Sequence, residues 1–210
     1  MKTIALFLHQ PRCSVQSANG IIQSLSPYYK FKIFTRHRLE DEFFDDVDCV
    51  AFPGGMGDSD SYDWMMRENA PRIRNFVNRG GRYLGICMGA YWADRDYFNI
   101  LDNVRAVQYI RRPHSDTRRP HAKACPITWQ GHAERMYFYD GCALIGTGFE
   151  TVAKYANGDA MAIIQNRIGL IGCHPESQEF WYDKRYLKPH WHQGRHNQLL
   201  QDFVSDLFSR

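Results

Sequence analysis

The sequence predicts an α/β fold with a doubly wound, mostly parallel sheet and an antiparallel extension. Two observations lead to this prediction. In the first half of the chain, apolar runs of strand length alternate with segments of helical period, as in repeated strand-helix-strand units. After residue 104, short strand-like runs follow one another with turn residues between them, which favours antiparallel pairing. The length of 210 residues favours a single domain over residues 1–210.

The first half contains the elements of a parallel sheet. The strands expected there are residues 3–8, 29–34 and 49–52 and the apolar run that ends at Cys87, with a helix over residues 17–25. A second helix leads into the Cys87 strand, with Asn69 as its N-cap, Pro71 in its first turn and Gly80-Gly81 as its end. Ligands of such a sheet bind at the carboxyl ends of its strands.

The second half contains shorter elements. The strands expected there are residues 104–110, 143–145, 152–155, 160–164 and 168–173. Gln165-Asn166-Arg167 is expected to close a hairpin between the last two. Apolar side chains at helical spacing between Leu199 and Phe208 predict an amphipathic C-terminal helix that packs on the domain, with a partner-binding helix as the alternative.

The most informative motif is Gly85-Ile86-Cys87-Met88-Gly89, at the end of an apolar strand. Glycines two residues to either side of a nucleophile are typical of a nucleophile elbow, because only glycine fits beside the sharp strand-to-helix turn that exposes the nucleophile. A cysteine there lies at a helix N-terminus, where the helix dipole favours the thiolate. Cys87 is therefore a candidate nucleophile, with a buried structural cysteine as the alternative.

A second motif, His174-Pro175-Glu176, follows the apolar run of residues 168–171. His174 is the candidate base for Cys87, and Glu176 is the candidate carboxylate that orients the imidazole and stabilises the imidazolium. Taken alone, a histidine after a strand is more often a surface or hydrogen-bonded core residue. Together with the elbow, the motif predicts a Cys-His-Glu triad.

A glycine-rich loop, Pro53-Gly54-Gly55-Met56-Gly57-Asp58, follows the expected strand at residues 49–52. Neighbouring strands of such a sheet deliver their loops to the same crevice, so this loop is expected beside Cys87. One of its amides, together with the amide of Met88, would form an oxyanion hole. The candidates are Gly54, Gly55 and Gly57, and the sequence does not separate Gly55 from Gly57. An ordinary glycine turn is the alternative.

The elbow followed by His174-Pro175-Glu176 resembles the class I glutamine amidotransferase superfamily, whose triad is Cys, His and Glu in this order. The segments Phe52-Pro53-Gly54-Gly55 and Gly80 to Tyr91 resemble more specifically the amidotransferase-like domain at the N-terminus of eukaryotic biotin protein ligases. The resemblance extends from about residue 3 to about residue 180. It implies a flavodoxin-like, class I glutamine amidotransferase-like fold with these triad roles, and it implies no cofactor.

The chain departs from this pattern in two places. Tyr91 stands where amidotransferases that use glutamine usually have Gln, so glutamine is not assured as the substrate. The 210 residues leave no room for a biotin ligase catalytic domain, so ligase activity is not expected. A related protease and chaperone branch of the broad fold normally has His directly after the nucleophile. This chain has Met88 there, which argues against that branch.

The two motifs predict an amidohydrolase or amidotransferase-like enzyme. Cys87 would attack an amide or related acyl carbon of a small molecule, and a thioester intermediate would follow. Release of ammonia to an acceptor would require a separate synthetase partner. The competing prediction is a noncatalytic binding or regulatory module that retains the fold; Tyr91 favours it, whereas Cys87, His174 and Glu176 argue against it.

Composition excludes several other classes. No segment approaches the roughly 20 apolar residues of a membrane span, and the N-terminal apolar run is too short for a signal peptide, so a cytoplasmic protein is expected. The net charge of +3 is too small to indicate nucleic-acid binding. The six cysteines contain no Cys-x-x-Cys pair, so reduced thiols are expected and a metal site is not.

Three further groups of polar residues have open interpretations. The basic stretch from Arg111 to Lys123 is either an exposed loop, a lid, or a site for phosphate, an acidic substrate or a protein partner. The carboxylates of residues 58, 60 and 63 either cap a helix or bind a substrate amine or a cation. Histidines 190, 192 and 196 do not have the spacing of a known zinc pattern.

Overall fold

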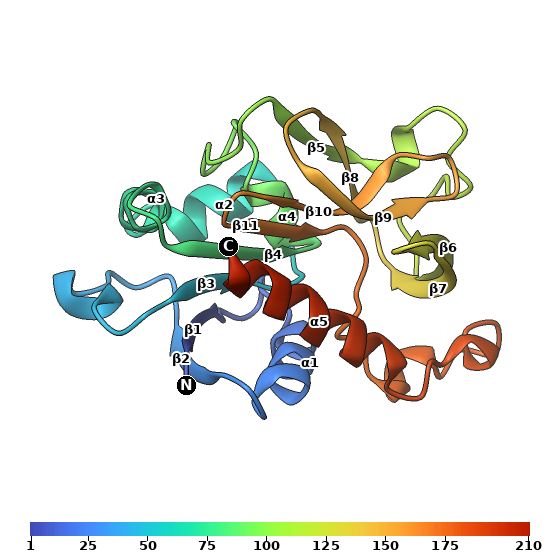
Figure 1. The fold of residues 1–210 in the computed structure, drawn as a ribbon, viewed down its shortest axis with the longest axis horizontal. Coiled ribbons are helices and arrows are strands. Elements are labelled where there is room, and N and C mark those ends of the chain that lie inside the picture. Colours follow the sequence, from blue (N-terminus) through green and yellow to red (C-terminus); the bar gives the residue numbers. More distant parts are fainter.

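The protein forms one mixed sheet of eleven strands with helices on both faces of its parallel part (Figure 1). The computed structural model describes residues 1–210 apart from the side chain of Asp41. The strand order is β2-β1-β3-β4-β11-β10-β9-β6-β7, with β8 paired to β10 and β5 paired to β8. Among the described residues, no helix combines the length and the apolar content needed to cross a bilayer.

The parallel part of the sheet contains the four strands expected in the first half of the chain and one strand from the second half. These are β1 (Thr3–Phe7), β2 (Lys30–Phe34), β3 (Cys49–Phe52), β4 (Arg82–Ile86) and β11 (Ile168–Ile171). The register pairs Phe52 of β3 with Gly85 of β4, and Ile171 of β11 with Ile86 of β4. The carboxyl ends of β3, β4 and β11 therefore lie side by side, and the segments that follow them share one edge of the sheet.

The expectation of a mostly parallel sheet is wrong. The antiparallel strands are β5 (Val104–Gln108), β6 (Lys123–Trp129), β7 (His132–Phe138), β8 (Cys142–Gly146), β9 (Glu150–Tyr155) and β10 (Ala160–Gln165). Of the ten strand pairings, four are parallel and six are antiparallel. The β6-β7 hairpin was not predicted, because Pro126 and the charged side chains of β7 obscure its apolar alternation. The expected hairpin turn between β10 and β11 is present.

The helices α1 to α5 cover the two faces of the parallel part (Figure 1). One face carries α1 (Val15–Leu25) and α5 (Arg195–Ser209), which contact each other, and the other carries α2 (Ser59–Met66), α3 (Ala70–Asn78) and α4 (Met88–Trp92). Successive residues of β1 alternate between the two cores: Leu6 packs in the core under α1 and α5, and Phe7 in the core under the other helices. The doubly wound description thus holds for the parallel part alone.

Two helix starts differ in how they are capped. Asn69 precedes α3 as expected but makes no capping bond; its side chain instead holds the loop at residues 35–39 by donating to the carbonyl of His37 at 2.7 Å and accepting from the amide of Leu39 at 3.0 Å. Asp58 caps α2 by accepting from the amide of Ser61 at 2.8 Å. The capping interpretation of Asp58 is therefore confirmed.

Candidate active site

Cys87 occupies the sharp turn between β4 and α4. Its backbone has φ 50° and ψ −100°, a region that a residue with a Cβ rarely adopts, and such strain is common at functional sites. The flanking glycines make this turn possible. A Cβ on Gly85 would lie 2.5 Å from the carbonyl oxygen of Gly89, and a Cβ on Gly89 would collide with the carbonyl oxygen of Phe52. The spacing of the motif therefore has the steric cause expected of a nucleophile elbow.

His174 and Glu176 come from the loop after β11, the strand that pairs with β4. The imidazole Nδ1 lies 2.8 Å from Oε1 of Glu176, and both side chains are buried. Cys87 and His174 line the same cavity. The structure thus brings together the three side chains that the two motifs singled out.

The electrostatics of this group favour the imidazolium. Burial opposes the charge on His174, but the carboxylate of Glu176 and the sulfur of Cys87 outweigh it and raise the pKa of His174 to about 10. An imidazolium between these two groups can neutralise a thiolate on one side while the carboxylate fixes its orientation on the other.

Ser17, in the first turn of α1, is a member of the site that the sequence analysis missed. Its hydroxyl donates to Oε1 of Glu176 at 2.6 Å and accepts from the amide of Gly54 at 2.9 Å. The other oxygen of the carboxylate, Oε2, is buried without a hydrogen-bond partner among the described residues. Both contacts on Glu176 therefore converge on Oε1. The available signal was topological: α1 begins at the carboxyl end of β1, on the same sheet edge.

Gly20, one turn further along α1, allows this arrangement. A Cβ on Gly20 would collide with the carbonyl oxygen of Glu176, so the helix can approach the His174–Glu176 loop only because this position is glycine. The N-terminal half of α1 thus packs against the loop that carries the carboxylate of Glu176.

The backbone amides of the glycine-rich loop differ in their hydrogen-bond partners. The amide of Gly54 is bound to Ser17, and a Cβ there would lie 2.7 Å from Cε1 of His174, so this glycine makes room for the imidazole. The amide of Met56 donates to the carbonyl of Arg12 at 2.8 Å. The amides of Gly55 and Met88 have no acceptor among the described residues. Both residues line the cavity that holds Cys87.

Backbone pairing distinguishes Gly55 within this loop. Gly55 forms an isolated antiparallel bridge with Cys13, flanked by hydrogen bonds from Ser14 to Gly54 and from Met56 to Arg12. In such a pair the amide of the bridged residue points away from the partner strand. The amide of Gly55 is therefore directed away from the segment at residues 12–14. Gly57 also lines the cavity, and a Cβ added to it would lie 3.6 Å from the ring of Tyr91, an ordinary contact distance.

Tyr91 ties the elbow helix to the turn at residues 139–141. Its hydroxyl donates to the carbonyl of Asp140 at 3.0 Å, and burial raises its pKa. The carbonyl of Tyr139, in the same turn, lies 3.6 Å from the sulfur of Cys87. The side chain of Asp140 accepts from Gln108 at 3.0 Å. Tyr91, at the position where glutamine-using amidotransferases usually have Gln, therefore holds in place the turn that carries Tyr139 and Asp140.

Cys87 lies between two cavities. The larger has a volume of about 410 Å³. Its lining besides Cys87 consists of Gly55, Met56, Gly57, Asp58, Met88, Tyr91, Tyr97, Gln108, Tyr139 and Asp140. The smaller, of about 210 Å³, contains His174 together with Tyr137, Tyr139, Trp181, Ser14, Gln16, Gly54 and Gly55. Gly55, Tyr139 and Cys87 belong to both.

Of the other polar groups that the sequence singled out, Asp58 lines the larger cavity, whereas the basic stretch and the C-terminal histidines line neither cavity. In the basic stretch, Arg112 pairs with Asp159 at 2.8 Å and Lys123 pairs with Asp116 at 2.6 Å, so these two side chains anchor the loop to the body of the protein. Most of the other residues between Arg111 and Lys123 form an exposed loop.

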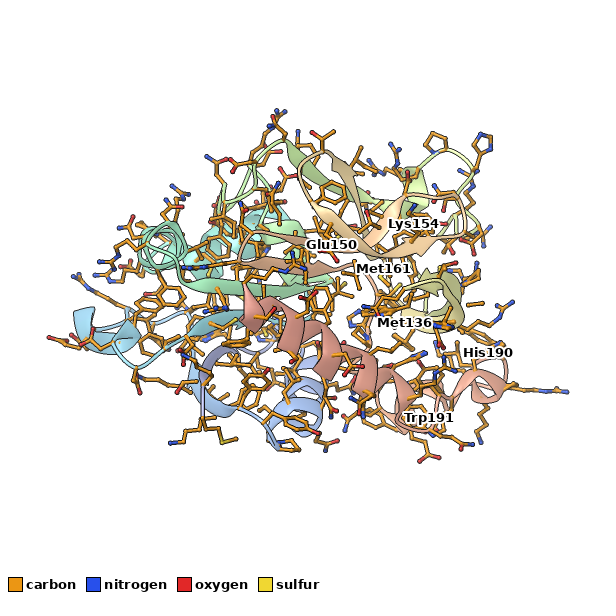
Figure 2. The ribbon with its side chains drawn as sticks, in the orientation of Figure 1. Met136, Glu150, Lys154, Met161, His190 and Trp191 are labelled. Atoms are coloured by element: carbon orange, nitrogen blue, oxygen red, sulfur yellow. The ribbon has the colours of Figure 1, made fainter. Side chains whose placement is uncertain are left out.

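The three histidines near the C-terminus lie just before α5 and in its first turn. His190 and Trp191 lie in the segment before α5 (Figure 2), and the rings of His192 and His196 stack at 4.0 Å. Burial lowers the pKa of His192 to about 3 and that of His196 to about 4. In the part of the chain that the structure describes, no three His, Cys, Asp or Glu side chains are grouped to hold a metal ion.

The fold is that of the glutamine amidotransferases. A glutamine amidotransferase from Thermotoga maritima superposes with a TM-score of 0.70 at 10% identity, covering 98% of this chain and 97% of that one. PurLQS from Thermotoga maritima gives 0.67 at 14% identity, covering 99% and 100%. A glutamine amidotransferase from Methylobacillus flagellatus gives 0.63 at 12% identity, covering 99% and 92%. At such identities the likeness establishes the fold alone.

Within that fold, residues 10–111 match the family described as biotin-protein ligase, N terminal. No curated protein matches the sequence. The resemblance expected from the elbow and from the glycine-rich loop is thereby confirmed: the chain has an amidotransferase-like fold related to the biotin ligase N-terminal domain.

Proposed function

We propose that this protein is a cysteine-nucleophile enzyme that hydrolyses an amide, or transfers its acyl group, through Cys87, His174 and Glu176. The observation that carries the proposal is the strained Cys87 elbow beside a buried His174–Glu176 pair, which Ser17 fixes from α1. Strain at the nucleophile and a buried carboxylate behind the histidine both cost stability, and such costs are typical of catalytic sites.

In the first half of the proposed reaction, Cys87 attacks the carbonyl carbon of the amide as a thiolate, with its proton held by His174. The amides of Gly55 and Met88 are proposed to bind the resulting oxyanion, because both are unpaired and line the cavity. His174 then gives its proton to the leaving nitrogen. The C–N bond breaks, and a thioester on Cys87 remains.

In the second half, His174 removes a proton from water or from an acceptor amine, which attacks the thioester carbon. The C–S bond breaks, the acid or the new amide leaves, and the thiolate of Cys87 is restored beside the imidazolium of His174. Glu176 stabilises the imidazolium in both halves. These steps need no cofactor. A small-molecule amide is the proposed substrate, and a separate synthetase or acceptor protein would use the amine if it is not simply released.

The reduced state of the cysteines is consistent with work in the cytoplasm, which we also propose. All six cysteines are free thiols, and all are buried. Burial raises the pKa of Cys13 to about 12, which marks it as an inert structural thiol. A reactivity measurement can therefore treat such cysteines as internal controls for Cys87.

The test is the rate at which iodoacetamide alkylates Cys87 near neutral pH, followed by peptide mapping. We expect Cys87 to be labelled faster than the other cysteines, and His174→Gln to slow the labelling by on the order of tenfold or more. His132→Gln is the matched control, because His132 is exposed on β7 and outside the site. Slow labelling that His174→Gln does not change would contradict the proposal and favour a noncatalytic binding module, the function that Tyr91 would suggest.

A further inference from the structure

The two cavities beside Cys87 differ in chemistry, and this difference bears on the substrate of the proposed reaction. His174 belongs only to the smaller cavity. Because His174 must protonate the leaving nitrogen, the nitrogen side of the scissile amide has to lie in the smaller cavity, and the acyl group is then left with the larger one. Gly55 lies at the junction of the two, where the carbonyl oxygen would be held.

The larger cavity is acidic. Asp58 and Asp140 line it, and among the described residues no Lys, Arg or His does. The cations whose charges act on these carboxyls, Arg12 for Asp58 and Arg111 for Asp140, do not line the cavity. An acyl group with a free carboxylate would meet like charge there without a partner, whereas an ammonium group would meet opposite charge.

The carboxyls are held in place by the protein rather than free to turn away. Asp58 accepts from the amide and the hydroxyl of Ser61 at 2.8 and 3.1 Å, and Asp140 accepts from Gln108 at 3.2 and 3.0 Å. Tyr91 fixes the backbone that carries Asp140. A binding site whose charges are fixed in advance loses little entropy when a ligand arrives.

The smaller cavity is aromatic and larger than ammonia requires. Trp181 lies edge-on to the His174 ring with a centroid separation of 5.4 Å, and Tyr137 lies 5.9 Å from the same ring. The volume of about 210 Å³ is several times the roughly 30 Å³ that one water-sized molecule occupies. An organic amine with an apolar or aromatic substituent would fill this space, and ammonia would not.

We propose that the substrate is an N-substituted amide of an amine-bearing acid, with the cationic acyl group between Asp58 and Asp140 and the organic amine against Trp181. This inference rests on the proposed function and narrows it to one substrate class. Glutamine does not belong to this class, because its nitrogen leaves as ammonia and its acyl group carries a carboxylate beside its ammonium group. In the reaction, the thiolate displaces the organic amine, which departs with the proton from His174.

A panel of matched amides tests the two halves of the proposal separately. The reference compound is the N-benzylamide of δ-aminovaleric acid, and it is compared with its primary amide and with the N-benzylamides of valeric and glutaric acids. Benzylammonium and ammonium are similarly acidic, so the leaving groups differ in size more than in reactivity. Amine release gives kcat/KM, and protection of Cys87 from iodoacetamide gives a binding readout that does not require turnover.

We expect kcat/KM for the reference compound to exceed that of each of the other three by about tenfold or more, the effect of one interaction of about 1.4 kcal/mol. Asp140→Asn should reduce the preference for the δ-aminovaleryl group over the valeryl group. Trp181→Ala should reduce the preference for the benzylamide over the primary amide. Asp183→Asn is the control, because Asp183 is an exposed carboxylate outside both cavities.

The outcomes separate this inference from the proposed function. Faster turnover of the glutaric or valeric compound, or of the primary amide, would overturn the inference while leaving Cys87 chemistry in place. A reactive, His174-dependent Cys87 that the reference compound neither acylates nor protects would also overturn the inference alone. A Cys87 whose labelling does not depend on His174 would overturn both.

Discussion

Replacement of Ser17 by alanine gives the sharpest test of how the site is assembled. The hydroxyl of Ser17 is the only described link between the glycine-rich loop and the buried carboxylate: it donates to Oε1 of Glu176 at 2.6 Å and accepts from the amide of Gly54 at 2.9 Å. Ser17→Ala removes both bonds at once. The methyl group that replaces the hydroxyl cannot bind either partner, and both partners are buried.

The size of the effect follows from these two bonds. A hydrogen bond to a charged group contributes about 1.5–3 kcal/mol, and a buried amide left without a partner costs about 1–3 kcal/mol. Because the two losses share one group and are not additive, we expect the free energy of unfolding to fall by about 3 kcal/mol. For a chain of this size, that corresponds to a decrease in Tm of roughly 6–12 °C.

Ser24→Ala is the matched control. Ser24 lies on the same helix and is also buried, but its hydroxyl has no hydrogen-bond partner among the described residues. Its removal should change the free energy of unfolding by less than about 0.5 kcal/mol. Urea unfolding, with Tm from thermal melts, measures both variants. Equal values for the two would refute the role assigned to Ser17, and so would a Ser17→Ala protein with wild-type stability.

Three further predictions concern stability. Gly85→Ala should prevent the elbow from forming, because its methyl group would lie 2.5 Å from the carbonyl oxygen of Gly89. Gly57→Ala is the control: its nearest contact would be at 3.6 Å, so its Tm should equal that of the wild type. Equal Tm values for the two variants would count against the steric argument. Burial lowers the pKa of His192 to about 3, so below the unfolded value of about 6.5 the unfolded chain takes up a proton that the folded chain does not. Stability should therefore fall from pH 6.5 toward pH 4, less steeply in His192→Gln; identical slopes in urea titrations across this range would be the contrary result. Arg82 donates to the carbonyls of Leu207, Phe208 and Arg210, and a lysine cannot reach all three. Arg82→Lys should therefore lower the free energy of unfolding by about 1–2 kcal/mol and speed amide hydrogen exchange at the end of α5. Unchanged hydrogen exchange there would contradict this role of Arg82.

The residues of the proposed triad could be chosen from the sequence because each lies in a short motif with a local cause. The glycines around Cys87 are required by contacts within the elbow and with β3, and such close approaches leave a fixed spacing in the sequence. His174 and Glu176 are two residues apart, so their pairing at 2.8 Å is also a local matter. That His174 follows a strand next to β4 could be anticipated from the rule for ligand sites of parallel sheets.

The proportion of antiparallel strand pairing could not be predicted from local sequence patterns. Strand direction depends on which partner a strand finds, and the apolar pattern of a strand buried on both faces is the same in either orientation. The β6-β7 hairpin was missed for a related reason, because its charged and proline-containing strands have no clean alternation. The sheet therefore gained strands that the sequence pattern assigned to loops.

Periodicity and short motifs were sufficient to predict the strands β1 to β4, the helices α1, α3 and α5 and the Cys87, His174 and Glu176 motifs, because these depend on spacing over a few residues; α2 and the parallel pairing of β11 were not predicted. The folded structure was needed to show that Ser17 supports Glu176 across 159 positions of sequence and that Tyr91 holds the turn at Asp140. It was also needed to show that the amide of Gly54 donates to Ser17, whereas the amide of Gly55 has no acceptor among the described residues. These contacts join segments far apart in the chain. Nothing in the local pattern records such a contact, since it exists only once the sheet has brought the carboxyl ends of its strands together.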